Sequence, residues 1–242
     1  MNSIGKCLAC STYSVSARVR RRGLAEIHSE YGRLIEIVKS RNGSLCIGRA
    51  PTGDGRYSPA VGWLQTEQTY FSDTVLVWAG FDQFRYPAFC SLCATLICEA
   101  LNIAMPLRGA VSVGEAVLDQ ATGTYVGNAI VEAANVEKAQ RWLGVSYAPS
   151  AAKHIQAFDP RLVLPYTQHR KEGTERLVEG AVLDWPRFWR ENYREDLVST
   201  LRRLQLSLGS HPYIDATIDF AGYSERQHDW FLKQSQIGIA EP

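Results

Sequence analysis

Residues 108–114 read RGAVSVG, and residues 127–137 read GNAIVEAANVE. The first segment opens an apolar, valine-rich stretch over 108–118, which predicts a β-strand. The second opens a stretch over 128–142 that we predict to be a helix, with a further strand or turn at 123–127 between the two. A strand, a return and a helix therefore follow one another here, and the remaining elements are predicted outward from this unit.

The elements before and after this unit complete a recognisable order. Apolar residues recur at spacings of three and four from Leu24 to Val38, which predicts an amphipathic helix. The other predicted elements are a strand at 5–11, a Gly-, Pro- and Ser-rich loop insertion at 48–62, strands at 66–71 and 74–78 joined by a tight turn, a buried helix at 88–101 and a short strand at 144–147. The order β-α-β-β-α-β, with one extra strand segment, is the split βαβ arrangement of ferredoxin-like palms, so we expect an α+β fold.

The texture of the chain changes after Pro149. A polar connector leads to Asp184-Trp185-Pro186, where the proline is well placed to start a helix. The apolar residues that follow on one side of this expected helix are Phe188, Leu197, Leu201, Leu204 and Leu208. We expect a palm over residues 1–150 and a mainly helical extension over residues 151–242 that packs on the palm.

The composition is ordinary for a globular protein. The 242 residues are 45% hydrophobic and 21% charged, with a formal net charge of +1. This balance gives no electrostatic reason to expect general binding to nucleic acid or to a membrane surface. The sequence contains no apolar run near the roughly 18 residues that cross a bilayer and no signal-peptide pattern at its start, so we expect a cytoplasmic protein.

The cysteines allow two interpretations. They are Cys7, Cys10, Cys46, Cys90, Cys93 and Cys98. Two Cys-x-x-Cys pairs among them could form a zinc site. However, the flanks of both pairs are apolar, and residues 89–101 read FCSLCATLICEAL, which predicts a buried helix in which cysteine acts as a small apolar residue. We favour reduced thiols in the core.

Three segments of the chain together resemble the core of the class III nucleotidyl cyclases. LACSTYS at 8–14 is similar to the first metal-binding strand of that family, whose pattern is roughly A-D-I-x-G-F-T. FSDTVLV at 71–77 is similar to the hairpin that carries the second metal carboxylate. The segments at 108–114 and 127–137 resemble the family's R-x-G-x-x-x-G strand and its G-D-T-V-N-L-A-A-R-L-E helix. The order and spacing of the segments are more specific than any one of them.

The resemblance implies a two-metal cyclisation. The ribose 3′-oxygen attacks the α-phosphorus and pyrophosphate leaves, while two divalent cations, Mn²⁺ or Mg²⁺, activate the nucleophile and neutralise phosphate charge. Asp73 is the expected carboxylate ligand, and the backbone of Cys10 is a further expected ligand. Thr12 and Tyr13 are expected near the substrate.

Ala9 departs from the family pattern, because the first metal aspartate is expected at this position and alanine cannot bind a metal. Three explanations stay open. The residue is an engineered inactivating substitution, the protein is a natural pseudo-enzyme, or the family pattern is shifted along this strand.

The resemblance also assigns phosphate-binding residues. Arg108 matches the arginine that contacts the triphosphate, a role suited to the fixed charge and fork geometry of the guanidinium. In the helix, Val131 and Asn135 stand where the family has its transition-state asparagine and arginine. Asn135 can still hydrogen-bond ribose or phosphate.

The expected base-recognition positions favour a pyrimidine. Purine cyclases of this class have a Lys and an Asp where this chain has Thr69 and Thr124, and Tyr70 is a further candidate contact. The stretch 184–190, DWPRFWR, followed by an aromatic end, resembles the extension of Pycsar-type cyclases, which make cyclic UMP or cyclic CMP as an anti-phage signal. We therefore expect UTP as the preferred substrate, CTP as the alternative, and an effector that responds to the product.

The family resemblance implies a homodimer with composite sites, in which one protomer supplies Asp73 and the other supplies the Asn135 helix. A nucleotide-binding pseudo-cyclase that regulates a partner is the main alternative. A palm-like nucleic-acid protein is favoured only by the basic run over 18–22, and a purely structural protein would leave the three-segment match to chance.

Overall fold

The computed structural model describes residues 5–14, 24–51, 57–71, 74–80, 85–155, 160–177, 180–208 and 212–227, and along β1 it describes the backbone only. The elements are β1 (Gly5–Ser14), α1 (Leu24–Arg41), β2 (Ser44–Pro51), β3 (Tyr57–Leu64), β4 (Thr66–Phe71), β5 (Thr74–Gly80), α2 (Tyr86–Asn102), β6 (Leu107–Asp119), β7 (Thr124–Gly127), α3 (Asn128–Ala139), β8 (Val145–Tyr147), α4 (Pro149–Ala152), η4 (Pro160–Leu162), β9 (Val163–Pro165), η5 (Glu175–Leu177), β10 (Ala181–Leu183), α5 (Trp185–Asn192), α6 (Leu197–Leu208) and α7 (Pro212–Arg226). The α+β class and the palm with its extension are confirmed.

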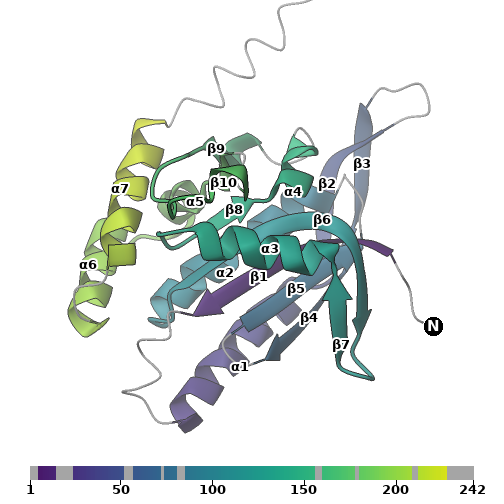
Figure 1. The fold of residues 1–242 in the computed structure, drawn as a ribbon, viewed down its shortest axis with the longest axis horizontal. Helices are drawn as coiled ribbons and strands as arrows, with labels where there is room; N and C mark the ends of the chain where they lie inside the picture. Colours follow the sequence, from purple (N-terminus) through teal and green to yellow (C-terminus); the bar gives the residue numbers. More distant parts are fainter. Residues whose placement is uncertain are drawn as a thin grey trace, which may run out of the picture.

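The main sheet has the strand order β4-β5-β1-β6-β8-β10-β9, with β7 paired to β6 (Figure 1). All of its pairs are antiparallel except β6 with β8. β1 is central, because Cys10 pairs with Val77 of β5 on one side and with Val111 of β6 on the other. The segments that resemble the cyclase core are therefore adjacent strands.

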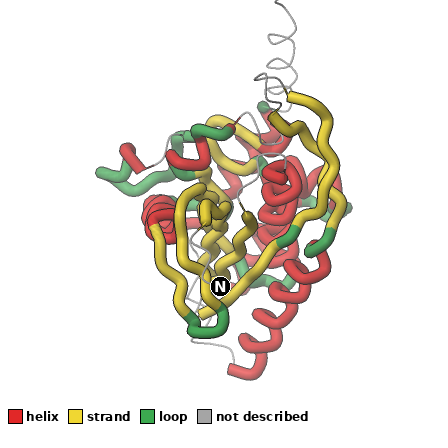
Figure 2. Tube along the Cα trace, turned by 90° about the vertical axis from the view of Figure 1, so that its right-hand side faces the viewer, coloured by secondary structure: helices red, strands yellow, loops and turns green. Residues whose placement is uncertain are grey.

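Helices lie on both sides of this sheet (Figure 2). On one side, Val75 and Val77 of β5 join the large core formed with α2. On the other side, Leu76 and Trp78 pack against α3. Because alternate residues of a strand point to opposite faces, β5 is buried on both faces, which explains its continuous apolar sequence.

Two glycines let α3 approach β6 closely. Gly127 precedes the helix with a φ of 156°, and a Cβ there would lie 2.4 Å from the carbonyl oxygen of Glu115. Gly114 faces Ala129, where a Cβ would make a tight contact at 3.4 Å. Glycine at position 127 is therefore required for the connection from β7 into α3.

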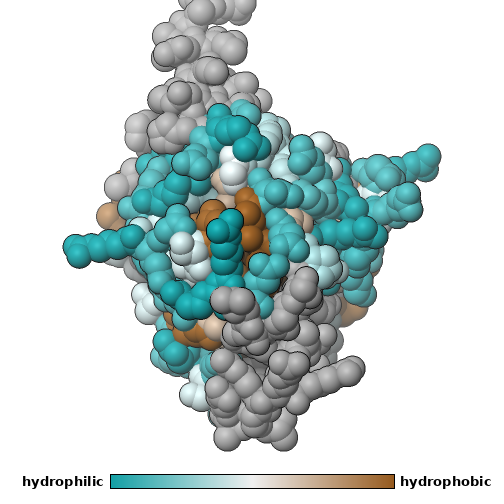
Figure 3. All heavy atoms as spheres, turned by 90° about the vertical axis from the view of Figure 1, so that its left-hand side faces the viewer, coloured by the Kyte–Doolittle hydropathy of each residue, from teal (hydrophilic) through white to brown (hydrophobic). Residues whose placement is uncertain are grey.

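The C-terminal extension is joined to the palm through its sheet and core. β10 pairs with both β8 and β9, so these two short strands extend the palm sheet. The buried Trp185 side chain donates to the carbonyl of Leu143 over 3.2 Å. Trp142 packs against Phe220 of α7 with ring centroids 4.3 Å apart. Figure 3 shows the outer face that carries α6 and α7, which is mostly hydrophilic with a small apolar area.

The structure corrects the predicted loop insertion at 48–62. β2 and β3 form a two-stranded hairpin there, at one edge of the molecule (Figure 1). Pro59 pairs with Arg49 within this hairpin. A strand of a two-stranded sheet has one free edge, so a residue without an N–H group is tolerated.

Two predicted helices end earlier than expected. The helix predicted over 128–142 ends at Ala139, because Gln140 adopts extended backbone angles and forms a β-bridge with Arg170. The helix predicted from Trp185 through Leu208 is two helices. Asp196 starts the second one by accepting a hydrogen bond from the backbone N–H of Ser199 over 2.7 Å.

The predicted buried cysteine helix is confirmed. Cys90, Cys93 and Cys98 are buried in the core on α2 and are not in disulfides. Cys7, Cys10 and Cys46 lie outside the side chains that the structure describes. Across the described ranges, no helix is long and apolar enough to cross a membrane.

Candidate functional site

One end of the sheet brings together three of the strands singled out by sequence. Tyr13 of β1 pairs with Thr74 of β5 and with Arg108 of β6. Thr74 follows Asp73, which lies outside the described residues. Partners in an antiparallel pair share a face, and the face shared here is the one that α3 covers, since Leu76 and Trp78 lie on it. Thr74 and Arg108 therefore flank β1 at the same level.

The register places Ala9 further along the strand. Ala9 pairs with Trp78 and Ser112, four residues from the level of Tyr13. At about 3.3 Å per residue, four residues correspond to about 13 Å. The structure therefore does not bring position 9 to the end of the sheet where Thr74 lies. Thr12 pairs with Val75 and Gly109, one residue from that end.

β1 has a further property that does not depend on register. Its sequence, GKCLACSTYS, contains neither aspartate nor glutamate. A metal site at this end of the sheet would therefore receive no carboxylate from β1, whichever residue of the strand were nearest.

Arg108 is held by side chains from two helices. Its Nε donates to a carboxylate oxygen of Glu137 on α3, and its guanidinium lies over the ring of Tyr213 on α7, 4.9 Å from the ring centroid. A second guanidinium nitrogen donates to the backbone carbonyl of Gln140 over 3.4 Å. The arginine expected to contact a triphosphate thus also joins β6 to α3 and to α7 of the extension.

The structure places Glu137, near the end of α3, in the interior. Its side chain has 0% exposure, against 18% for Arg108. Burial raises the pKa of Glu137 above its ordinary value, and the adjacent Arg108 guanidinium opposes that rise. A glutamate close to the alanines of the segment 128–139 was the sequence signal that could have identified it.

A pocket of about 210 Å³ lies on the outer side of α3. Its lining residues are Asn128, Val131, Glu132, Asn135, Val136, Pro149, Arg176 and Leu177. Asn135 is exposed, and Val131 is 56% exposed. The two helix positions named by the family pattern therefore open on the same pocket. Arg176, which sequence reasoning missed, lines it from η5 in the extension.

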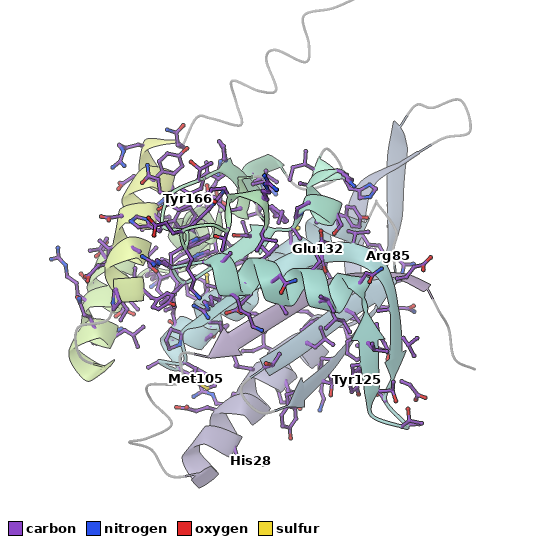
Figure 4. The ribbon with its side chains drawn as sticks, viewed as in Figure 1. His28, Arg85, Met105, Tyr125, Glu132 and Tyr166 are labelled. Atoms are coloured by element: carbon purple, nitrogen blue, oxygen red, sulfur yellow. The ribbon has the colours of Figure 1, made fainter. Side chains whose placement is uncertain are left out.

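The Glu132 side chain is oriented toward α4 (Figure 4). Its carboxylate accepts hydrogen bonds from the backbone N–H of Ser150, over 3.1 Å, and from the Ser150 hydroxyl. The Ser150 hydroxyl oxygen accepts from the N–H of Val113 on β6, over 2.9 Å. This chain of contacts fixes the α3 side of the pocket to the sheet.

The expected base-recognition residues lie near the turn between β6 and β7. Thr69 of β4 pairs with Leu76 and is half-buried, whereas Thr124 at the start of β7 is exposed. The amide of Gln120, on the turn before β7, donates to the carbonyl of Gln68 over 3.5 Å, so the turn lies against β4. The two threonines are therefore on elements that meet.

Two aromatic residues lie near these threonines. Tyr125, which follows Thr124, packs against Trp78 with ring centroids 5.8 Å apart (Figure 4). Tyr70 is 47% exposed at the end of β4.

The described side chains do not by themselves form a metal centre. None of their His, Cys, Asp and Glu residues gather in groups of three that could hold an ion. Glu137, the carboxylate beside Arg108, is committed to that arginine. The expected carboxylate ligand, Asp73, lies outside the described residues.

Comparison with known proteins supports the fold. No family model and no curated protein matches the sequence. Among solved structures, the chain is similar to a bacterial light-regulated adenylyl cyclase, with a TM-score of 0.50 and 12% sequence identity. The fold is cyclase-like. The match covers 86% of this chain and 59% of the other, so the chain spans less than two thirds of that cyclase.

Proposed function

We propose that this chain is a nucleotidyl cyclase that binds a pyrimidine nucleoside triphosphate, with UTP preferred over CTP, and forms the 3′,5′-cyclic nucleotide. The observation that carries the proposal is the arrangement of β5, β1 and β6 as adjacent strands, with Thr74 and Arg108 at the same level at one end of the sheet. The helix α3 covers this face of the sheet, and its Asn135 lines a pocket. The three-segment resemblance and the cyclase-like fold support it. Use of the product as an anti-phage signal belongs to the same proposal.

The two halves of the proposed site face different directions. The sheet end lies on the α3-covered face, and the pocket lies on the outer side of α3. The pocket has a volume of about 210 Å³, whereas pockets that bind small molecules usually have volumes of at least roughly 300 Å³. We therefore propose a head-to-tail homodimer, in which the sheet end of one protomer meets the pocket of its partner around one nucleotide.

The reaction needs alignment and charge stabilisation from the protein. The ribose 3′-oxygen attacks the α-phosphorus, its proton leaves to solvent or a base, and the bond to pyrophosphate breaks. Negative charge grows on the phosphate oxygens as this occurs, so fixed donors such as the Asn135 amide are useful. Asp73 is the proposed carboxylate for divalent cations, which would supply Lewis-acid chemistry when bound.

Asp73 gives a direct test of this proposal. Asp73→Asn should abolish the Mn²⁺ dependence of UTP binding measured by isothermal titration calorimetry. The matched control is Glu36→Gln on α1, a carboxylate 71% exposed that pairs only with Lys39 among the described residues. If Asp73→Asn and Glu36→Gln bind UTP and Mn²⁺ alike, Asp73 is not a metal ligand.

The second candidate function is a nucleotide-binding pseudo-cyclase. The specific observation in its favour is that β1 carries no carboxylate. It predicts UTP binding with no cyclic product at any enzyme concentration, whereas a slow cyclase yields product in proportion to enzyme.

A further inference from the structure

The α3 side of the pocket lacks the charge that a triphosphate requires. Its α3 residues are Asn128, Val131, Glu132, Asn135 and Val136, and the charged residue among them is acidic. The family pattern has an arginine where this chain has Asn135. A site that binds phosphate on this surface must therefore obtain positive charge from elsewhere.

Arg176 is the cation that lines the same pocket. It belongs to η5, a single turn in the extension. The segment is tied to α3 because the N–H of Lys171 donates to the carbonyl of Ala139, the last residue of the helix, over 2.9 Å. A turn then brings the chain back, with the N–H of Thr174 donating to Lys171 and that of Leu177 donating to Thr174 over 3.3 and 3.0 Å. These bonds set Arg176 opposite the helix.

The Arg176 side chain is available to a ligand. It is exposed, and within the ranges that the structure describes it has no hydrogen bond or ion pair. Arg108, in contrast, is engaged by Glu137 and Tyr213. Among the described residues, Arg176 thus has no structural partner that would compete with phosphate.

The acidic residue of the pocket does not neutralise Arg176 directly. The Glu132 carboxylate accepts two hydrogen bonds from Ser150, from the N–H and from the hydroxyl. These bonds hold it toward α4, and no ion pair joins it to Arg176 in the described part of the chain. The wall near α4 is therefore acidic, and the wall formed by η5 is basic.

We propose that Arg176 binds phosphate oxygens of the nucleoside triphosphate in this pocket and supplies, from the extension, the positive charge that the family pattern places on the helix at the position of Asn135. The inference rests on the proposed function. A guanidinium can bind two phosphate oxygens at once and keeps its charge at all relevant pH values. A pocket of about 210 Å³ can hold phosphate groups while the rest of the nucleotide extends out of it.

The test uses inorganic tripolyphosphate, which contains the phosphate chemistry without base or ribose. Its affinity is measured by calorimetry for the unaltered chain, Arg176→Ala and Arg176→Lys, with Arg202→Ala on α6 as an exposed arginine control. We expect about a tenfold or greater loss for Arg176→Ala, because a charge-assisted hydrogen bond is lost. We expect a smaller loss for Arg176→Lys and no change for Arg202→Ala. Equal melting temperatures establish that the variants are folded.

A charge relocation completes the test. Asn135→Arg added to Arg176→Ala should recover most of the lost affinity, since the helix then supplies the cation. Unchanged tripolyphosphate affinity in Arg176→Ala, or no binding by the unaltered chain, overturns the inference. Arg176-dependent binding of tripolyphosphate without a cyclic product from any nucleoside triphosphate would leave the inference standing and refute the proposed cyclase activity.

Discussion

The guanidinium of Arg108 and the carboxylate of Glu137 form an ion pair in which the carboxylate has no solvent exposure. The second oxygen of that carboxylate has no hydrogen-bond partner among the described residues. The pair links β6 to the last turn of α3, and Tyr213 extends it to α7. It therefore couples the end of the sheet at which we propose phosphate binding to the helix that carries Asn135.

Removing Arg108 should destabilise the fold. Arg108→Ala leaves a buried carboxylate without its cation, so we expect the free energy of unfolding to fall by about 3 kcal/mol. For Arg108→Met combined with Glu137→Gln, the free energy of unfolding should fall less, because no charge remains buried. Urea denaturation measures both. A loss below about 0.5 kcal/mol for Arg108→Ala would show that the pair is not structural.

The loss in Arg108→Ala should depend on pH. Burial raises the pKa of Glu137 in the folded chain above the ordinary value of 4.5, and Arg108 opposes that rise. The native state then binds its proton more tightly than the unfolded state, so stability falls as pH rises between the two pKa values. Without Arg108 the folded pKa rises further. The free energy of unfolding of Arg108→Ala should be closest to that of the unaltered protein below pH 4.5, and the difference should grow as pH rises. Urea denaturation at several pH values measures this difference.

Asp184 joins α5 to α7. Its buried carboxylate accepts from the N–H of Arg187 over 3.3 Å and from the hydroxyl of Ser224 over 2.5 Å. Asp184→Ala removes a helix cap and leaves a buried hydroxyl with one bond fewer, so we expect a loss of about 2 kcal/mol in the free energy of unfolding. Asp184→Asn should lose less, as its amide oxygen can still cap. Equal stability of all three proteins would contradict this.

The base preference is tested through Thr69 and Thr124. In competition binding, UTP should displace a labelled nucleotide more effectively than CTP, and both more effectively than ATP or GTP. Thr69→Lys with Thr124→Asp should shift the ranking toward purines. A purine ranked first by the unaltered chain would reject the pyrimidine assignment.

The register of β1 predicts different outcomes for two new carboxylates. Position 9 pairs with Trp78 and Ser112, which are buried under α3, so Ala9→Asp should lower the melting temperature without raising Mn²⁺ affinity. Tyr13→Asp, level with Thr74, should raise Mn²⁺ affinity measured by calorimetry. If Ala9→Asp instead binds Mn²⁺ and gains activity, position 9 reaches the metal site as the family pattern implies.

Local sequence patterns predicted the elements that bury a regular face. The helix with Cys90 and Cys93 and the strand after position 73 were found because a long apolar run predicts a buried element, and both are buried in the structure. The hairpin around Pro59 was missed because Gly and Pro usually indicate a loop. Here the strand has a free edge, so it tolerates a proline. The strands β9 and β10 were missed because each has three residues, which are too few to show an alternation of apolar and polar side chains.

The candidate site was predictable only in part. Arg108 and Asn135 were each proposed from a pattern within a single segment, 108–114 for the first and 127–137 for the second. Glu137 and Arg176 were not, because their roles depend on contacts between β6, α3 and a distant turn that no local spacing encodes.

Product analysis of the purified chain tests the central proposal most directly. The chain, at a concentration near that of the substrate, is incubated with UTP, CTP, ATP or GTP and Mn²⁺, and products are identified by mass spectrometry with synthetic 3′,5′-cyclic standards. We predict cyclic UMP and pyrophosphate in equal amounts, formed slowly because β1 carries no carboxylate, with less cyclic CMP and the least from purines. The absence of any cyclic nucleotide after prolonged incubation with all four triphosphates would contradict the proposal that this protein is a nucleotidyl cyclase.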